Sequence, residues 1–321
     1  MSRSKKSTPL LTRHVGSYAE FDEANIVAEG RTTVVGPEKT AWEQQTLWID
    51  DVGLQVFQEG GANFYEAEAP ADHVTLALEL PASSSISYNG VPIGKGLAVA
   101  RPGRAIATHS SDVCRYCCFV VPLDRFFEWV DRFDPSQIER LALGADHLDV
   151  DPAKRRIALA TVDRVLKAAA VGKGLRCRTQ RHAMLEELIG AFVATTAQSS
   201  HGPKKVGRPK QPRERIVRRV REYLDANSSC AVAEMARYAE VSERTLRSVV
   251  CEQLGISPKQ LVMHRKLGDI RSALQLASAD ETVSAIAARY AVWDLGRFAQ
   301  RYRVVFGEKP SETLSVRASG H

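Results

Sequence analysis

The sequence lacks any apolar run long enough to cross a membrane and any cysteine pattern typical of a disulfide framework. No stretch approaches the roughly 18 apolar residues of a membrane helix, and the N-terminus MSRSKKSTPLLTRHVGSYAEF has no apolar core like that of a signal peptide. Six Cys in 321 residues suit a reducing compartment. We therefore expect a cytoplasmic protein that does not bind a membrane.

Histidine is scarce where a metal enzyme would need it. A metal-dependent oxygenase or isomerase on a β-barrel usually has an H-x-H pair followed closely by Glu. His73 and His109 stand 36 residues apart, each without a neighbouring His. The segment VCRYCCFVVP, which contains Cys114, Cys117 and Cys118, is typical of a buried strand. We expect no metal, no cofactor and no catalytic residue, so the protein is not predicted to be an enzyme.

Positive charge is unevenly distributed along the chain. The stretch from His201 to Arg221, HGPKKVGRPKQPRERIVRRVR, has nine Lys or Arg and one Glu. From Lys204 to the C-terminus there are 22 Lys and Arg and 13 Asp and Glu, a net charge of +9, which leaves −3 for residues 1–203. The basic third predicts a polyanionic partner, because neutralised phosphates release counterions. The basic run taken alone also fits a solvated linker.

Residues 32–122 consist of short β-type runs separated by turn residues. Examples are TLWIDDVGLQVFQEG, HVTLALEL and CRYCCFVVP, with turns expected at Asn89-Gly90 and Pro102-Gly103. Closely spaced strands without intervening helices predict a small sandwich or barrel. From Leu123 the apolar spacing becomes helical, as in AKRRIALATVDRVLKAAAV and TQRHAMLEELIGAFVATTA. The expected stripe of the first of these helices is Ile157, Ala160, Thr161 and Val165. Such stripes pack either on a partner subunit or on the β-domain of the same chain.

The C-terminal third contains an internal repeat at a spacing of 52 residues. The segments VSERTLRSVVCEQLGISP and WDLGRFAQRYRVVFGEKP each have an N-cap residue, apolar residues at every fourth position, a Gly that ends the helix and a Pro that begins the next. Upstream, AVAEMARYAE matches VSAIAARYAV. Each half therefore predicts a helix, a tight turn and a second helix, and SPKQLVMHRKLGDIRSALQLA between them predicts one long connecting helix.

The second helix of each unit combines an apolar face with a basic one. The expected inner faces are Leu246, Val249, Val250 and Gln253 in the first unit, and Phe298, Tyr302 and Val305 in the second. The inner face holds such a helix on its domain, while outward Arg side chains can donate bidentate hydrogen bonds to guanine in the major groove. In the second unit, Gly296 allows a close backbone approach and Gln300 can read adenine or phosphate. This pattern is typical of a DNA recognition helix.

With these two units, and with SERTL…LGISP and RFAQRYRVVFGEKPSETL in place, residues 213–315 resemble the AraC/XylS family of bacterial transcription regulators. The resemblance implies an α+β chain, with an N-terminal cupin-like β-domain that binds a small-molecule effector and helices that dimerise. It implies an all-α C-terminal domain whose two recognition helices enter successive major-groove segments of double-stranded DNA, and RNA polymerase as a partner. The expected regions are a flexible extension (1–31), the β-domain (32–122), helices (123–198), a basic Gly/Pro linker (199–212) and the DNA-binding domain (213–321).

Two groups of residues are expected to contact DNA. Bases should be read by Arg244, Arg247, Ser248, Gly296, Arg297 and Gln300, and phosphates or the minor groove should be contacted by Lys204, Lys205, Arg208, Lys210, Arg301 and Arg303. The segment VGRPKQP also resembles the core of an AT-hook, which lies in the minor groove of A·T-rich DNA. The alternative is a flexible tether whose charge holds the domain near phosphates.

The chain departs from the family pattern in both turns. Glu240 stands where the first unit usually has Gly, and Ala291-Val292 replaces the usual Gly-Phe. A left-handed conformation costs a non-Gly residue about 1 kcal/mol, so we expect reshaped turns rather than a lost fold. Ser248 and Val250 replace a common Arg and Phe. The alternatives to a sequence-specific regulator are a metal-dependent cupin enzyme, a non-specific DNA-architectural protein and a relative that has lost DNA binding.

Overall fold

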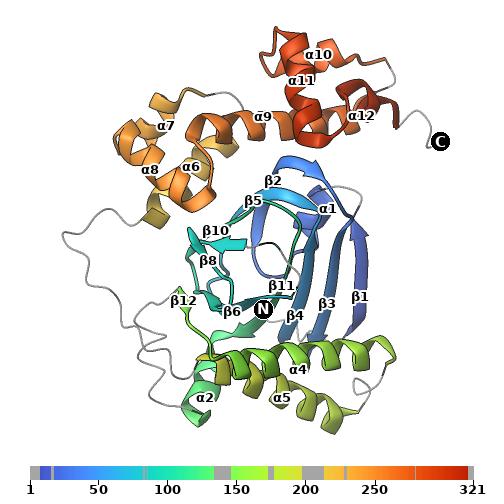
Figure 1. Cartoon of the computed structure of the whole chain (residues 1–321), viewed down its shortest axis with the longest axis vertical. Coiled ribbons are helices and arrows are strands. Elements are labelled where there is room, and N and C mark those ends of the chain that lie inside the picture. The colour runs from blue at the N-terminus through green and yellow to red at the C-terminus, as the bar shows by residue number, and fades with distance from the viewer. Residues whose placement is uncertain are drawn as a thin grey trace.

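The computed structural model describes residues 8–15, 18–81, 84, 86–133, 146–172, 177–196, 213–227, 230–278 and 280–316. Figure 1 shows a two-sheeted β-domain with helices at its lower end and the C-terminal helices at its upper end. Within the described ranges, no helix has the length and apolar character required to cross a membrane.

The β-domain is built from two antiparallel sheets. Its strands are β1 (Thr8–Val15), β2 (Glu29–Glu38), β3 (Trp42–Ile49), β4 (Val52–Glu59), β5 (Gly61–Glu68), β6 (His73–Glu79), β7 (Ile86–Tyr88), β8 (Val91–Pro92), β9 (Leu97–Ala100), β10 (Ala105–Ser110), β11 (Cys114–Pro122) and β12 (His147–Leu148). One sheet has the order β1-β3-β4-β11-β6-β9-β12 and the other β2-β5-β10-β7-β8. The expected turn at Asn89-Gly90 joins β7 to β8, and both residues have positive φ, 48° and 79°. This confirms a β-rich N-terminal region.

The β-domain begins earlier than expected. Residues 8–31 were predicted as an extension, yet they contain β1, helix α1 (Tyr18–Glu23) and the start of β2. Strand β1 is held by its antiparallel pairing with β3. Helix α1 contributes Phe21, which is buried with its ring centroid 4.9 Å from that of Trp42. These contacts are made with residues far along the chain, so the local sequence does not reveal them.

Two apolar layers flank the seven-stranded sheet. Its inner face packs on the five-stranded sheet through residues such as Trp42, Phe57 and Ile106. Its outer face is covered by α4 (Pro152–Ala170) and α5 (Arg178–Thr196), with α2 (Leu123–Phe133) beside them. The predicted stripe of α4 was partly wrong, because Ile157 is 58% exposed and a different set of residues is buried. These are Ala158, Thr161, Val162, Val165 and Ala169.

The C-terminal domain is entirely helical, as predicted. It consists of α6 (Arg213–Ala226), α7 (Val232–Tyr238), α8 (Glu243–Leu254), α9 (Pro258–Gln275), α10 (Val283–Arg289), α11 (Leu295–Phe306) and α12 (Pro310–Val316). Helices α7 and α8 form the first unit and α10 and α11 the second. Helix α9 runs between them as one continuous helix (Figure 1). It begins with the predicted capping box of Ser257 and Gln260, with Pro258 at the first helical position.

Both unusual turns contain a residue in the left-handed region. Glu240 has φ 57° and Ala291 has φ 53°. Only at Glu240 do side-chain contacts offset the backbone strain. The Glu240 carboxylate forms ion pairs with Arg219 at 2.6 Å and with Arg215 at 3.1 Å, whereas Ala291 has only a methyl group. Hydrogen bonding from Arg219 also keeps the pKa of Glu240 below its ordinary value.

Ala291→Gly should therefore stabilise the protein by roughly 0.5–1 kcal/mol, because glycine removes the left-handed strain at a smaller entropic cost. Glu240→Gly is the matched variant and should gain less, since it also removes two ion pairs. Urea unfolding of both variants measures the difference. A lower midpoint for Ala291→Gly than for the unchanged protein would contradict the strain at this turn.

Candidate DNA-binding surface

Helix α8, predicted to be the first recognition helix, is fixed at both ends and along one face. The Ser242 hydroxyl accepts a hydrogen bond from the Thr245 amide at 3.1 Å, and Gly255 ends the helix with φ 69°. The predicted inner face is confirmed, because Leu246, Val249, Val250 and Gln253 are all buried. The remaining face of α8 is therefore held outward by its packing.

The second recognition helix, α11, repeats this arrangement. The Asp294 carboxylate accepts a hydrogen bond from the Arg297 amide at 2.9 Å, and Gly307 ends the helix with φ 76°. Phe298, Tyr302 and Val305 are buried as predicted. The Tyr302 hydroxyl lies 2.8 Å from that of Thr313 on α12, which satisfies its polar group in the core.

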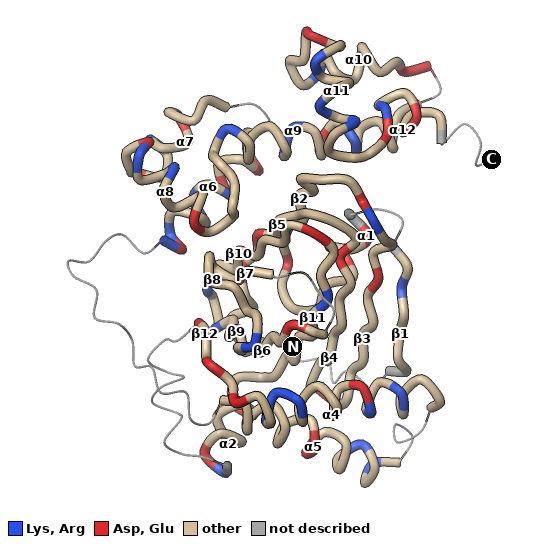
Figure 2. The backbone as a smooth tube through the Cα atoms, in the orientation of Figure 1, with Lys and Arg blue, Asp and Glu red and all other residues tan. Residues whose placement is uncertain are grey.

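The predicted base-reading residues all lie on the outward faces of these two helices. In the first unit, Arg244, Arg247 and Ser248 are exposed. In the second, Gly296, Arg297 and Gln300 are exposed, as are Arg301 and Arg303, which were predicted to contact phosphate. Figure 2 shows basic residues along both α8 and α11. The structure therefore groups these residues on two separate basic faces, one for each unit.

The arginines of α8 and α11 differ from those of α6 and α9 in having no anionic partner within the described residues. All five Arg of α6 form ion pairs with Asp or Glu, and so do Arg265 and Arg271 of α9. Within the described part of the chain, no carboxylate pairs with an Arg of α8 or α11. These are Arg244, Arg247, Arg297, Arg301 and Arg303. Their guanidinium donors are all available to an external acceptor.

Two further residues belong to this surface that the sequence did not indicate. Lys259, at the start of α9, lines a recess of about 350 Å³ together with Arg244 and Arg247. Trp293, two residues before α11, is 81% exposed, and Leu295, the first residue of α11, is 42% exposed. A large exposed aromatic at the start of a recognition helix can contact sugar or the methyl group of thymine. The sequence could have indicated Trp293, because it is an aromatic residue that does not belong to the apolar positions of the repeat.

The basic run before α6 cannot be placed on this surface. Lys204, Lys205, Arg208 and Lys210, predicted as contacts to phosphate or the minor groove, lie outside the described residues. Their role stays a prediction from the sequence.

His73 and His109, the two histidines of residues 32–122, do not form a common site. His73 is on β6, beside Asp72 at 2.7 Å, and His109 is on β10 in the other sheet. The His109 ring faces Gly255, where a Cβ atom would come within 2.7 Å of the ring. Within the described residues, no three His, Cys, Asp or Glu side chains gather in a metal-binding arrangement.

A small internal cavity lies between the two sheets of the β-domain. Its volume is about 40 Å³, and its lining is apolar, aromatic and hydroxyl-bearing, with no charged side chain among its lining residues. The lining includes Asn25, Tyr65, Tyr88, Thr108 and Tyr116. Burial raises the pKa of the Tyr65 and Tyr88 hydroxyls above the ordinary range, so both are neutral donors. The cavity therefore suits a small uncharged molecule or part of one.

Comparisons with known proteins find one family model and several relatives that each match part of the chain. The model of a helix-turn-helix domain family matches residues 235–315. The XylDLEGF operon transcriptional activator of Pseudomonas putida is 35% identical over 131 residues, which are 40% of this chain and 38% of that protein. The XylDLEGF operon transcriptional activator 2 of the same organism is 33% identical over 104 residues, or 32% of this chain and 65% of that protein. The chain thus spans less than two thirds of these relatives.

A solved structure, the AraC-like transcriptional activator CuxR, has similarity over a longer part of the chain. The alignment covers 82% of this chain and 96% of that one, at 13% identity and a TM-score of 0.39.

Proposed function

We propose that this chain, which belongs to the AraC/XylS family through its C-terminal double helix-turn-helix domain, is a sequence-specific DNA-binding transcription regulator. In this proposal α8 and α11 each enter one of two successive major-groove segments of double-stranded DNA. The observation that carries it is the set of unpaired, exposed arginines on these two helices, beside ion-paired arginines on α6 and α9. Unpaired guanidinium groups on a helix face are the donors that guanine recognition requires.

Selection of bound sites from random double-stranded DNA tests this function. The expected result is a motif of two short blocks whose centres lie about one helical turn, 10–10.5 base pairs, apart. Footprinting of the selected DNA should then show a short, bounded site. A selection that enriches no motif, together with diffuse protection, would favour a DNA-architectural protein and contradict the proposal.

We propose further that the β-domain binds a small-molecule effector and that the protein acts as a homodimer. The uncharged cavity between the sheets supports an effector site. Ile157 on α4 and Val171, the residue that follows α4, are exposed and leave apolar surface for a partner subunit. A regulator that reads two sites gains affinity from dimerisation through a raised effective concentration. RNA polymerase would be its partner at the promoter, and the cytoplasm, where bacterial DNA lies, its compartment.

The basic run is proposed to act as an arm that reaches DNA phosphates. Replacing Lys204, Lys205, Arg208 and Lys210 together by Gln should lower the magnitude of the slope of log affinity against log salt by about 0.9 for each phosphate that the arm neutralises. The selected major-groove motif should be unchanged, because phosphates position a protein and base edges specify the site. An unchanged salt slope would show that the arm does not touch DNA.

A minor-groove role for the arm makes a narrower prediction. Arg208→Ala alone should weaken binding chiefly where A·T-rich DNA flanks the motif, because a narrow groove concentrates negative potential. Binding titrations with A·T-rich and G·C-rich flanks give the comparison. An equal weakening on both flanks would leave only the electrostatic tether.

A further inference from the structure

The turn of the second helix-turn-helix unit is one residue longer than that of the first. One residue separates the left-handed Glu240 from the N-cap residue Ser242, whereas two residues separate the left-handed Ala291 from the N-cap residue Asp294. In both turns the amide after the left-handed residue donates to an alanine carbonyl of the preceding helix, so the two turns are otherwise equivalent. The predicted spacing of 52 therefore holds from the N-cap onward but not before it, and the extra residue is Trp293.

The fold does not bury this extra residue. Val292 packs against the apolar core, as Val241 does in the first unit, whereas Trp293 is 81% exposed. Leu295, the first residue of α11, is 42% exposed and stands where the first unit has Glu243. Leaving two apolar side chains in water forgoes the free energy of burying them. The second unit therefore presents apolar groups at a place where the first unit presents a charge.

Gly296, in the first turn of α11, is not required by the packing of the chain. Its φ is not in the left-handed region, and among the described residues an added Cβ atom would meet only a carboxylate oxygen of Asp294, at an ordinary contact distance of 3.7 Å. Glycine within a helix lowers stability relative to alanine. The equivalent residue of the first unit is Arg244. The second unit thus leaves open space of about the size of a methyl group beside its exposed apolar residues.

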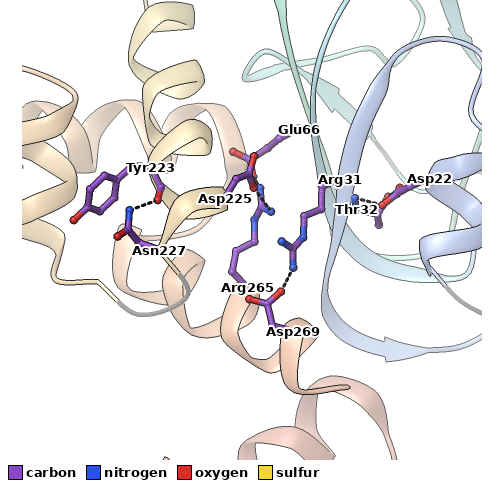
Figure 3. Close-up of polar contacts among 9 residues, drawn as sticks. All are labelled: Asp22, Arg31, Thr32, Glu66, Tyr223, Asp225, Asn227, Arg265 and Asp269. Carbon is purple, nitrogen blue, oxygen red and sulfur yellow. Dashed lines mark hydrogen bonds and ion pairs between the residues drawn. The ribbon is translucent and has the colours of Figure 1, made fainter. Parts of the chain in front are cut away.

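Unpaired cations lie on the same helix as these apolar groups. Arg297 and Arg301 are exposed on one face of α11 (Figure 2), and within the described part of the chain neither pairs with a carboxylate. By contrast, Arg265 of α9 is held by Glu66 at 2.6 Å and by Asp225 at 3.2 Å (Figure 3). Apolar side chains followed by unpaired guanidinium groups suit DNA, in which anionic phosphates flank the bases, better than the apolar surface of another protein.

Thymine is the base that presents an apolar group in the major groove. Its C5-methyl is contacted by apolar side chains, while the other base edges are read through hydrogen bonds. Burying one such carbon changes an affinity about fourfold.

We propose that Trp293 and Leu295, together with the open space at Gly296, bind thymine methyl groups. In consequence the block read by α11 contains thymine recognised by its methyl group, whereas the block read by α8 is recognised through polar groups. This inference rests on the proposed function and adds the base chemistry that distinguishes the two units.

Uracil substitution in the selected DNA site tests the inference with the full-length protein. Uracil pairs like thymine and lacks only the methyl group, so replacing thymine in one block at a time should weaken binding about fourfold for each contacted methyl in one block and leave the other unaffected. Trp293→Ala should weaken binding to the thymine site and lose most of this discrimination. Leu276→Ala, which removes another apolar side chain that is 79% exposed, is the control and should retain it. A site without thymine, no effect of uracil, or full discrimination by Trp293→Ala would overturn the inference, and the last result would assign Trp293 to a different contact.

Gly296→Ala separates binding from stability, because the two should change in opposite directions. Alanine should raise the midpoint of urea unfolding, yet its methyl group occupies the open space, so binding to the thymine site should weaken about fourfold or more. Gly268→Ala in α9, where an added Cβ has no described neighbour within 4 Å, should raise the midpoint similarly and leave DNA binding unchanged. Undiminished binding by Gly296→Ala would overturn the role of the open space. A selection that enriches no motif would overturn the proposed function itself, whereas a motif without methyl dependence overturns only this inference.

Discussion

Binding-site selection with the double variant Arg244→Ala, Arg247→Ala should return only one of the two blocks of the wild-type motif. Both side chains are exposed on α8, both line the same recess, and neither has a carboxylate partner in the described chain. Each bidentate arginine contact to a base contributes about 1–3 kcal/mol of discrimination. Each of the two substitutions should decrease affinity roughly 10- to 100-fold. The change in base preference should be confined to the bases that α8 reads.

Three companion variants make this result specific. Arg297→Ala and Gln300→Ala on α11 should alter only the other block. Arg215→Ala on α6 removes an exposed arginine that already pairs with Glu240 at 3.1 Å, so the motif should be preserved with only a small decrease in affinity. Thermal unfolding should be nearly unchanged in the α8 variants, because exposed side chains away from caps contribute little to stability. A wild-type motif bound at undiminished affinity by Arg244→Ala would refute the assignment.

Helices α8 and α11, with their buried and exposed faces, could be predicted because their determinants are local in sequence. The cap and core of each recognition helix are set by residues within about three turns, such as Ser242, Leu246 and Gly255 in α8, and the repeat presents the same information twice. A helix with one apolar face must turn that face to its domain, so the outward position of Arg244 follows. Even the left-handed residues Glu240 and Ala291 were indicated by the missing glycines.

The buried contact between Glu66 of β5 and Arg265 of α9 could not be predicted, because its determinants are not local. Glu66 and Arg265 are 199 positions apart, and each lies in a segment whose pattern is explained without the other. A lone Glu in a strand and an Arg in an amphipathic helix are ordinarily solvated. The packing of α4 shows the same limit, since Ala158 and Val162 are buried whereas the larger Ile157 is exposed. Which residues of a helix are buried depends on the surface against which the helix packs. The local sequence carries no information about that surface.

On DNA that carries two copies of the two-block motif, a fragment from Arg213 to the C-terminus should bind about 10²- to 10⁴-fold more weakly than the intact protein. The proposed dimer is formed by residues before this point, and two linked reading domains bind with an effective concentration that a monomer lacks. The fragment should nevertheless select the same single-copy motif, because α8 and α11 with all their caps are retained. Removing the β-domain also uncovers the apolar cluster that Phe64 buries, so circular dichroism must first show that the fragment is helical and unfolds cooperatively.

Fusing the same fragment to an unrelated parallel coiled coil separates the contributions of the N-terminal region. Because the coiled coil restores the effective concentration but contains neither the cavity nor the five-stranded sheet, the fusion should recover most of the affinity of the intact protein. Any small molecule found to shift DNA binding by the full-length chain should leave the fusion unaffected, since its binding site lies between sheets that the fusion lacks. Two results would exclude the assignment of dimerisation and effector binding to the residues before Arg213 and of DNA binding to the residues after it. One is an unfused fragment that equals the intact protein in affinity and cooperativity, and the other is a fusion that still responds to the molecule.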